Sequence, residues 1–552
     1  MCGIWAVFGI SPEKIRHHET SAKISHRGPD AWRIEYDNRL KNGCLCFHRL
    51  SIVDELCGMQ PMKRIFNPHL TLLCNGELYN CERLSEEFGF KYESHCDVEC
   101  IMHLYDKFGA DRTASMLDGV FGFCLVDAKK RRILIARDAY GVRPLFRLTG
   151  PGGVLGICSE AKGLIHLVDG PEYKLDPFPP GTFEEYELDL EGRATLIRQQ
   201  KYYTIGDKPA YRMAVLEKDY SDDIYANIRT VFTAAVKKRL MADRRIGCLL
   251  SGGLDSSLVA ALLVKLANEA NLPYKVQTFS IGMGDESPDL VAARKVAAHI
   301  GSEHHEVVFS EKDVEDVLKD VLYHLEIADI TTLRASIPMF LLARYIKEKT
   351  DSTVIFSGEG ADEVAQGYIY FRDAPSEEEG HKESLRLLNE LYLYDVLRTD
   401  RTTAAHSLEV RVPFLDHQFS SYYLNLPKKL LQPQDNVEKY VLRKAFDGLD
   451  LLPKDILWRH KEAFSDGVAS KKKPIFKILQ ETIEPLVPNE ALAEAEKRFP
   501  QCTPKTKEAL FYRQEFDSNY PGQGHWLPHF WMPRWSDATD PSAQFISHYA
   551  AE

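Results

Sequence analysis

The order of apolar and polar positions divides the chain into two patterns. Up to about residue 205, short apolar runs of β type are separated by turns. The clearest runs read CGIWAVFGI, CLCFHRLSIV, LTLLCNGELYN, VFGFCLVDAKKRRILIARD and TFEEYELDL, with a helical stretch, DVECIMHLYDKFG, among them. This pattern predicts mostly antiparallel sheets with added helices, an α+β layered domain.

After residue 223 the pattern changes to strand, helix, strand. RRIGCLL leads through a turn into the helical SLVAALLVKLANEA, and the strands YKVQTFSIG, EHHEVVFS and STVIFSG follow with helices between them. One helical stripe in DVEDVLKDVLYHLE comprises Val314, Val317, Leu318, Val321, Leu322 and Leu325. Such alternation predicts a parallel, doubly wound α/β sheet that binds ligands at the carboxyl ends of its strands.

The polar segment KPAYRMAVLEKDYSDD separates the two patterns. A chain of 552 residues also exceeds the size at which a single hydrophobic core stops growing. We therefore predict two domains, residues 2–205 and 224–552, joined by a linker at 206–223.

Composition narrows the class of protein. The content of 44% hydrophobic and 27% charged residues is typical of a soluble globular protein, and no apolar run approaches the roughly 18 residues of a membrane span. The formal net charge of −12 disfavours nucleic-acid partners. The 12 cysteines have irregular spacings, which favours a reducing compartment over a disulfide framework. We therefore expect a cytosolic protein without nucleic-acid or membrane partners.

Cys2 follows Met1 directly, in the sequence MCGIW. Removal of Met1, which is usual before a small residue, would leave Cys2 with a thiol beside a free α-amine. That amine has a pKa of about 7.7 to 8.0, so its neutral fraction at pH 7 can act as the base for the thiol. The alternatives are a buried structural cysteine in a first strand and a palmitoylated chain end.

The segment LLSGGLDSS follows a buried strand and precedes a helix. Gly252 and Gly253 allow the backbone to approach a ligand closely, and the helix N-terminus directs amide groups at an anion. Hydroxyl donors come from Ser251, Ser256 and Ser257. Asp255 would repel a bare phosphate, so its presence suggests a bridging Mg²⁺. The segment has the SGGxDS form of the N-type ATP pyrophosphatases rather than that of a Walker loop; the alternative is a Gly-Ser turn that caps an ordinary helix.

A second polar segment, SGEGADE at residues 357–363, follows another buried strand. The carboxyl ends of parallel strands meet at one sheet edge, so its three carboxylates should lie near the glycine loop and could bind metal and nucleotide. Arg334, in TTLRAS, lies on the same side, where its guanidinium fork could bind a substrate carboxylate. Arg334 could instead be a structural ion-pair partner.

Together these features resemble one family, the glutamine-hydrolysing asparagine synthetases of the eukaryotic type. The resemblance runs over nearly the whole chain through MCGIWAVFG, HRGPDA, FHRLSIVD, NGELYN, RDAYGVRPLF, SEAKGL, RRIGCLLSGGLDSSLVAA, SGEGADE, TTAAHSLEVRVPFLDH, WRHKEAFSDG and WMPRW. It implies an N-terminal-nucleophile glutaminase domain of αββα fold, followed by an α/β, doubly wound synthetase domain of the ATP-pyrophosphatase type. The sequence departs from the family at two points: Ala361 stands where many eukaryotic members have serine, and GMGDESPDL, between Ile281 and Asp289, is slightly longer than in some relatives.

For the first domain, the resemblance implies that Cys2 attacks the side-chain amide of glutamine. Asn75 and Gly76 match the oxyanion hole, whose donors stabilise the tetrahedral oxygen. The expected glutamine-binding residues comprise one arginine for the α-carboxylate, two acids for the ammonium and two backbone positions: Arg49, Glu77 and Asp97, Ile52 and Val53.

For the second domain, the resemblance implies ATP binding by the glycine loop and by neighbouring strand ends. The full ATP-binding set is Leu249, Ser251, Gly252, Gly253, Asp255, Ser256, Ile281, Ser357 and Gly358. Asp255 and Asp362 would lie near Mg²⁺ and pyrophosphate, and Glu359 would act around a β-aspartyl-AMP intermediate. The positions expected to handle aspartate, pyrophosphate or the adenylate are Thr331, Arg334, Asp362 and Lys461.

The implied reaction has three steps. Glutamine gives glutamate and ammonia, aspartate and ATP give β-aspartyl-AMP and pyrophosphate, and ammonia then displaces AMP. The implied cofactor is Mg²⁺ with ATP, and the family also suggests a homodimer. The alternatives are a related amidotransferase or β-lactam-forming synthetase, and a binding protein of this fold without catalysis. Cys2 disfavours the β-lactam branch, and the retention of Cys2, Arg49 and Asp255 disfavours the binding protein.

Overall fold

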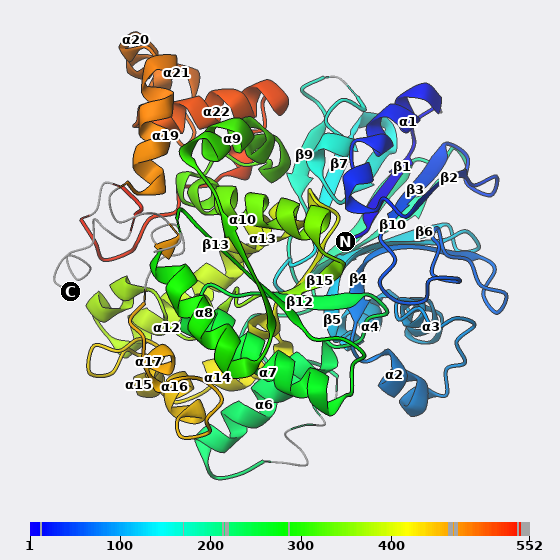
Figure 1. Ribbon diagram of the computed structural model, residues 1–552. Helices are drawn as coiled ribbons and strands as arrows, with labels where there is room; N and C mark the ends of the chain where they lie inside the picture. Colours follow the sequence, from blue (N-terminus) through cyan, green and yellow to red (C-terminus); the bar gives the residue numbers. More distant parts are fainter. Residues whose placement is uncertain are drawn as a thin grey trace. The chain divides into compact units, whose positions relative to one another are not determined.

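The computed structural model describes the whole chain except residues 12–13, 169, 212, 214, 216–219, 285–286, 462–466, 469–472, 538–539 and 543–552. The chain forms two compact units (Figure 1). Unit 1 comprises Met1–Arg212, Met241–Arg244 and Ala404–Leu408, and unit 2 comprises Met213–Leu240, Arg245–Thr403 and Glu409–Glu552.

The first change of unit along the chain falls inside the predicted linker at 206–223, of which residues 212, 214 and 216–219 lie outside the described part. Two short later segments also belong to unit 1. Arg244 pairs there with Asp30 at 2.9 Å, and the Ser407 hydroxyl donates to the His26 carbonyl at 2.7 Å. A single boundary in the sequence cannot assign these two segments to unit 1, because their assignment depends on tertiary contacts.

Unit 1 is built on two antiparallel sheets. The first has the order β2 (Ala31–Tyr36), β3 (Gly43–Arg49), β1 (Gly3–Phe8), β8 (Val154–Cys158), β7 (Phe146–Gly150), β9 (Lys174–Pro177). The second has the order β11 (Ala194–Lys201), β10 (Thr182–Leu188), β6 (Arg132–Arg137), β5 (Gly119–Asp127), β4 (Leu70–Leu78). The strand pairs are antiparallel in both, as the alternating runs separated by turns predict.

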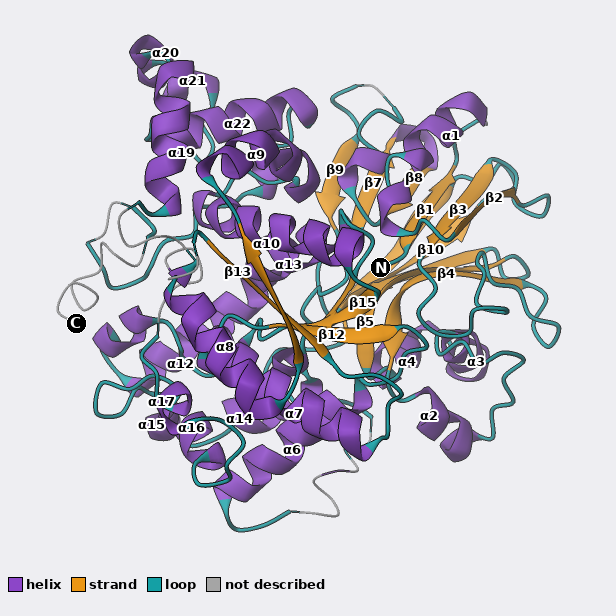
Figure 2. Ribbon diagram, viewed as in Figure 1, coloured by secondary structure: helices purple, strands orange, loops and turns teal. Residues whose placement is uncertain are grey.

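Helices cover the outer faces of the two sheets of unit 1 (Figure 2). One apolar cluster joins Ala6 of β1 to Ile135 of β6, and so fills the space between the sheets. A second cluster joins the other face of the second sheet to α2 (Cys81–Phe88), α3 (Glu99–Phe108) and α4 (Ala110–Thr113). On the first sheet, the Trp5 ring packs on His17 of α1 (Lys14–Ala22), with ring centroids 5.5 Å apart. These layers confirm the predicted αββα class.

Unit 2 contains one parallel sheet. Its order is β14 (Glu303–Val308), β13 (Gln277–Gly282), β12 (Arg245–Leu249), β15 (Ser352–Phe356), β16 (Glu409–Arg411). Because β12 comes first along the chain but lies at the centre, the chain leaves it in opposite directions toward β13 and β15. This arrangement confirms the predicted doubly wound sheet and creates a switch point beside β12, where such folds bind ligands.

The helices of unit 2 follow the predicted alternation and continue beyond it. Their bounds are α6 (Ile224–Lys238), α7 (Leu254–Glu269), α8 (Pro288–Ile300), α9 (Glu311–Leu325), α10 (Ile330–Lys349), α11 (Ala361–Val364), α12 (Glu377–Glu390), α13 (Asp395–Ala404), α14 (His417–Leu424), α15 (Lys428–Leu431), α16 (Tyr440–Phe446), α17 (Lys454–Leu457), α19 (Ile475–Ile483), α20 (Asn489–Ala493), α21 (Ala495–Arg498) and α22 (Lys507–Asn519). The predicted apolar stripe of α9 is buried along its length. Among the described helices, none has the length and apolar character needed to cross a membrane.

Candidate active sites

The predicted nucleophile, Cys2, lies directly before β1 in unit 1. The Cys2 thiol is 3.4 Å from the Leu50 carbonyl oxygen, and Arg27 donates to the Cys2 carbonyl at 3.0 Å. Met1 is fully buried and precedes Cys2, so the Cys2 nitrogen is part of a peptide bond. A free α-amine beside the thiol therefore requires removal of Met1.

Asn75 and Gly76 lie in β4, opposite β5. The Asn75 side chain is 1% exposed, and its amide nitrogen has no hydrogen-bond partner in the described part of the protein. A buried donor without a partner costs free energy, which an incoming oxygen would recover. A Cβ on Gly76 would come within 2.4 Å of the Val120 carbonyl oxygen, so only glycine fits beside β5.

The two acids predicted to bind glutamine, Glu77 and Asp97, lie near Cys2 and the strand that carries Asn75. Burial raises the pKa of the Cys74 thiol well above its usual value, and the nearby Asp97, Cys2 and Glu77 add to the rise. Asp97 accepts a hydrogen bond from the Leu78 amide at 2.6 Å. The structure therefore brings Cys2, Glu77 and Asp97 together around the strand that carries Asn75.

Arg49 ends β3, directly before the Leu50 carbonyl that contacts Cys2. Its guanidinium donates to the carbonyl oxygens of Asp54 and, at 2.7 Å, of Glu55. Carbonyl groups carry no net charge, so these bonds fix the guanidinium without neutralising it. In the same segment, the Ile52 carbonyl accepts from the Asp243 amide at 2.8 Å, and Val53 is half-buried.

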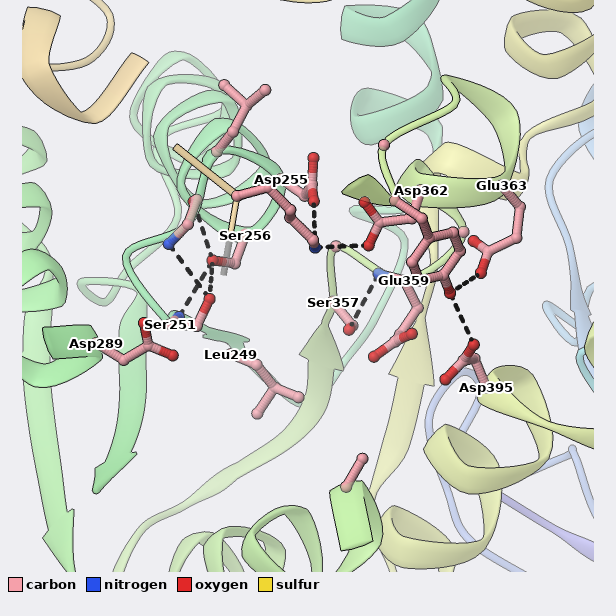
Figure 3. A pocket seen from close by; sticks show the side chains of 18 of the residues that line it. Leu249, Ser251, Asp255, Ser256, Asp289, Ser357, Glu359, Asp362, Glu363 and Asp395 are labelled. Carbon is pink, nitrogen blue, oxygen red and sulfur yellow. Dashed lines mark hydrogen bonds and ion pairs between the residues drawn. The ribbon is translucent and has the colours of Figure 1, made fainter. Parts of the chain in front are cut away.

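In unit 2, the glycine loop follows β12 and leads into α7. Gly252 has φ of +76°, and a Cβ there would lie 2.5 Å from the Cβ of Ala292, so the position requires glycine. The Ser251 and Ser256 hydroxyls lie 3.0 Å apart, and the Ser256 oxygen also accepts from the Ser251 amide at 3.1 Å (Figure 3). The first turn of α7 directs its unpaired amides at this loop, which suits an anion.

A cavity of about 260 Å³ opens beside this loop. It lies at the carboxyl ends of the central strands, where Leu249, Ile281 and Ser357 contribute to its wall. Gly253, Gly358 and Thr331 also line it. The switch point of the sheet thus gathers most of the residues predicted to bind ATP.

Two carboxylates and two lysines form an ionic cluster in the cavity (Figure 3). The Lys439 ammonium lies 2.5 Å from Asp255 and 2.6 Å from Asp362, and Lys461 lies 2.7 Å from Asp362. Burial alone would raise the pKa of Asp362, but the Lys439 and Lys461 charges lower it well below its usual value. The second oxygen of Asp255, Oδ1, is buried and has no hydrogen-bond partner in the described part of the chain.

Glu359 belongs to a second charged group in the cavity. Arg398 donates to both of its carboxylate oxygens at 2.9 Å and to Asp395 at 2.7 Å. The Tyr368 hydroxyl lies between two further carboxylates, 2.5 Å from Glu363 and 3.1 Å from Asp395. Burial raises the pKa of Glu359 to about 7, although the Arg398 charge opposes the rise.

Lys439, Asp395, Arg398 and Tyr368 are part of this site but were not predicted. Lys439 precedes α16 with φ of +56°, and the sequence around it, EKYVLRKAF, reads as an ordinary helix. Asp395 and Arg398 are three residues apart in α13, a spacing also typical of exposed helical pairs. The sequence signal for these residues would have been a charged residue at a helix position where the apolar pattern expects a buried side chain. By itself, such a signal is weak evidence for a site.

Arg334 differs from its neighbour Thr331, which lines the cavity. The Arg334 guanidinium is 4% exposed and is held by two carboxylates of the chain itself, Glu508 at 2.6 Å and Asp540 at 2.7 Å. Both faces of its fork are therefore occupied, as the ion-pair alternative anticipates, and it is not among the described residues that line the cavity.

Comparisons with known proteins match both units. Residues 1–178 match the family profile described as glutamine amidotransferase domain, and residues 227–382 and 372–541 match the profile described as asparagine synthase. Three curated relatives, each named asparagine synthetase [glutamine-hydrolyzing], match 100% of this chain and 99% of their own length. They come from Gallus gallus, Bos taurus and Homo sapiens, with identities of 55%, 53% and 52%.

Proposed function

Because this chain belongs to the asparagine synthetase family of the glutamine-hydrolysing type, we propose that it makes asparagine from aspartate with ATP and the amide nitrogen of glutamine. In this assignment it is a ligase with two active sites, one in each unit. The observation that carries the proposal is the cavity at the switch point, where Asp255 of the glycine loop lies with Asp362, Lys439 and Lys461. Such a site can bind ATP and stabilise the pyrophosphate that leaves when the bond between the α and β phosphates breaks.

We propose that unit 1 hydrolyses glutamine. Once Met1 is removed, the Cys2 amine takes the thiol proton and the thiolate attacks the side-chain carbonyl carbon of glutamine. The Asn75 side-chain amide nitrogen, which has no partner among the described residues, supports a role in holding the developing oxyanion, because it loses no hydrogen bond to them in doing so. The protonated Cys2 amine gives that proton to the amide nitrogen, the C–N bond breaks and ammonia leaves; water then hydrolyses the thioester, which releases glutamate and the thiol. Arg49, with its charge fixed by carbonyl groups, suits the α-carboxylate of glutamine.

We propose that unit 2 activates aspartate as an adenylate. A carboxylate is a poor electrophile, so one of its oxygens attacks the α-phosphorus of ATP and pyrophosphate leaves. Ammonia then attacks the acyl carbon, and AMP leaves with the bonding pair. Lys439 and Lys461 lie where positive charge would stabilise the departing pyrophosphate.

Glu359 suits a proton-transfer role in the second step. A carboxyl group with a pKa of about 7 can accept a proton at neutral pH and lose it again. Attack of ammonia on the acyl carbon releases a proton, and Glu359 lies in the cavity where that attack takes place in this proposal. Arg398 holds its two oxygens in place.

We propose Mg²⁺ as the cofactor that accompanies ATP. Asp255 and Asp362 offer the oxygen ligands that Mg²⁺ prefers, and Asp255 Oδ1 is buried without a partner in the described part of the chain. Bound there with ATP, Mg²⁺ would offset the charge of the phosphates. Asp255→Asn should then remove both glutamine-dependent and ammonia-dependent synthesis while glutamine hydrolysis continues; retained synthesis would refute the role of Asp255.

The proposal also includes a cytosolic location and a homodimer. The irregular spacing of the 12 cysteines, which form no disulfide in the described part of the chain, supports the cytosolic location. The homodimer rests on the family. Sedimentation of the purified protein and imaging of a tagged chain in cells would test them.

The experiment that tests the function uses purified protein with Mg²⁺, ATP, aspartate and amide-¹⁵N glutamine. Mass spectrometry should detect ¹⁵N-asparagine, AMP and pyrophosphate in equal amounts. Glutamate and free ammonia without asparagine would mean that the acceptor is a molecule other than aspartate or that the synthetase site is inactive. Formation of ADP in place of AMP would refute the adenylate.

A further inference from the structure

Arg334 connects three elements of unit 2. It lies in α10, on a turn whose neighbours Thr331 and Ala335 line the cavity. Its Nε and Nη2 donate to the two oxygens of Glu508 in α22 at 2.9 and 2.6 Å. Its Nη1 and Nη2 donate to the two oxygens of Asp540 at 2.7 and 2.9 Å. One guanidinium thus makes two bidentate carboxylate pairs.

Of the two carboxylates, Glu508 alone is enough to neutralise the Arg334 guanidinium. Glu508 is 3% exposed and also accepts from the Tyr512 hydroxyl at 2.9 Å, within α22. One carboxylate already neutralises one guanidinium, so the pair with Glu508 satisfies the charge of Arg334. The pair with Asp540 is therefore not required to balance the charge of Arg334. Its role lies in the residues that follow Asp540 in the chain.

Asp540 is followed directly by two residues that line the cavity, Pro541 and Ser542. We call residues 540–542 the wall segment. Within it, Asp540 Oδ1 accepts from the Ser542 amide at 2.9 Å, which folds the three residues into a tight turn. Fixing the Asp540 carboxylate therefore fixes Pro541 and Ser542 against the cavity.

The start of α10 also anchors a nearby part of the chain. Asp329 caps this helix through the Thr332 amide at 2.9 Å, and its other oxygen accepts from the Trp531 amide at 2.8 Å. Thr331 donates to the Trp531 carbonyl at 3.3 Å. Trp531 lines the cavity as well. One end of α10 thus holds two pieces of the same cavity wall, through Asp329 and through Arg334.

We infer that Asp540 is a positioning residue: held by Arg334, it places Pro541 and Ser542 against the substrates in the cavity and strengthens their binding. The inference rests on the proposed function, because it takes this cavity as the site of ATP and aspartate. It assigns Arg334 a role through the wall segment, in contrast to direct binding of a substrate carboxylate.

Asp540→Asn tests the inference with little risk to folding, because Glu508 still neutralises Arg334. In ammonia-dependent synthesis, we expect the KM for ATP or aspartate to rise about three- to tenfold, while kcat changes less. Asp540→Glu should recover part of the affinity. The matched control is Asp537→Asn, which alters an exposed carboxylate three positions earlier and should behave as wild type.

Two kinetic results would overturn the inference. Unchanged KM values would mean that the wall segment does not contribute to binding. A lower KM for aspartate would mean that Asp540 competes with the substrate for Arg334, so that Arg334 binds substrate directly.

A second measurement does not depend on catalysis. Trypsin can cleave after Arg534, which is exposed and lies between Trp531 and the wall segment. If Asp540 anchors this part of the chain, Asp540→Asn should speed release of the peptide 535–552 about threefold or more, and Asp537→Asn should not. Equal cleavage rates would refute the anchor. Faster cleavage in a protein that forms no asparagine would instead support the anchor and refute the proposed function.

Discussion

The Lys439 ammonium lies 2.5 Å from the Asp255 carboxylate, although the two residues are 184 positions apart in the sequence. The same ammonium lies 2.6 Å from Asp362, so one buried cation joins the glycine loop to the second acidic segment. A cation here can hold the two carboxylates together in the free protein and can move toward the phosphates when ATP binds. The contacts of Lys439 therefore support a testable role for it in the synthetase reaction, although no motif predicted this residue.

Lys439→Met should lower ammonia-dependent asparagine formation about 100-fold, because it removes positive charge from the place where pyrophosphate forms. Glutamine hydrolysis should continue, since the change lies in the other unit. Product quantification with each nitrogen donor checks both outcomes. Lys444→Met, which removes an exposed lysine that pairs with Asp447, is the matched control. Synthesis at the wild-type rate would exclude Lys439 from the mechanism.

Cys2→Ala should abolish glutamine-dependent synthesis and leave ammonia-dependent synthesis near the wild-type rate. The thiol is needed only to release ammonia, which can be supplied directly. Cys57→Ala, at an exposed cysteine of the same unit, should change neither rate. If both activities of Cys2→Ala disappeared in a folded protein, the two-site mechanism would be wrong.

Asn75→Ala should reduce glutamine hydrolysis about 10²- to 10³-fold in kcat, because it removes a donor to the oxyanion. The KM for glutamine should change little, since that donor acts mainly in the transition state. Asn67→Ala is a close control: Asn67 is also buried in unit 1 with an unpartnered side-chain nitrogen in the described part. A similar loss in both variants would point to folding and away from the oxyanion.

The stability of Glu359→Gln should depend on pH in a defined direction. Burial raises the pKa of Glu359 from 4.5 to about 7, so the folded protein holds this proton more tightly than the unfolded chain does. Stability supplied by the proton is complete below about 4.5 and is lost as the pH rises through about 7. Gln does not titrate, so the melting temperature of the variant relative to wild type should rise across this interval.

Gln also differs from protonated Glu359 in its hydrogen-bonding groups, which adds a difference between Glu359→Gln and wild type that stays nearly constant with pH. Differential scanning calorimetry at several pH values separates it from the titration. Glu348→Gln, at an exposed position of α10, should show a flat difference. A flat difference for Glu359→Gln as well would contradict the raised pKa.

Local patterns predicted much of the fold. The alternating runs of unit 1, the apolar stripe of α9 and the strand before the glycine loop all formed as expected. Each depends on a period of two or 3.6 residues, which a single segment displays by itself. The strands that the patterns did not predict include β16, whose three residues, Glu409–Arg411, are too short to show a period.

The sequence by itself determined the two domain classes, the glycine loop and the residues whose type and order match a known motif. Only the tertiary structure decided which charges meet. Lys439 reaches Asp255, Arg398 holds Glu359, and Asp540 occupies Arg334 across 206 positions. An isolated charge on a helix looks the same whether it faces water or a buried carboxylate, because burial comes from the packing of distant segments. That packing selected the partners of each catalytic group.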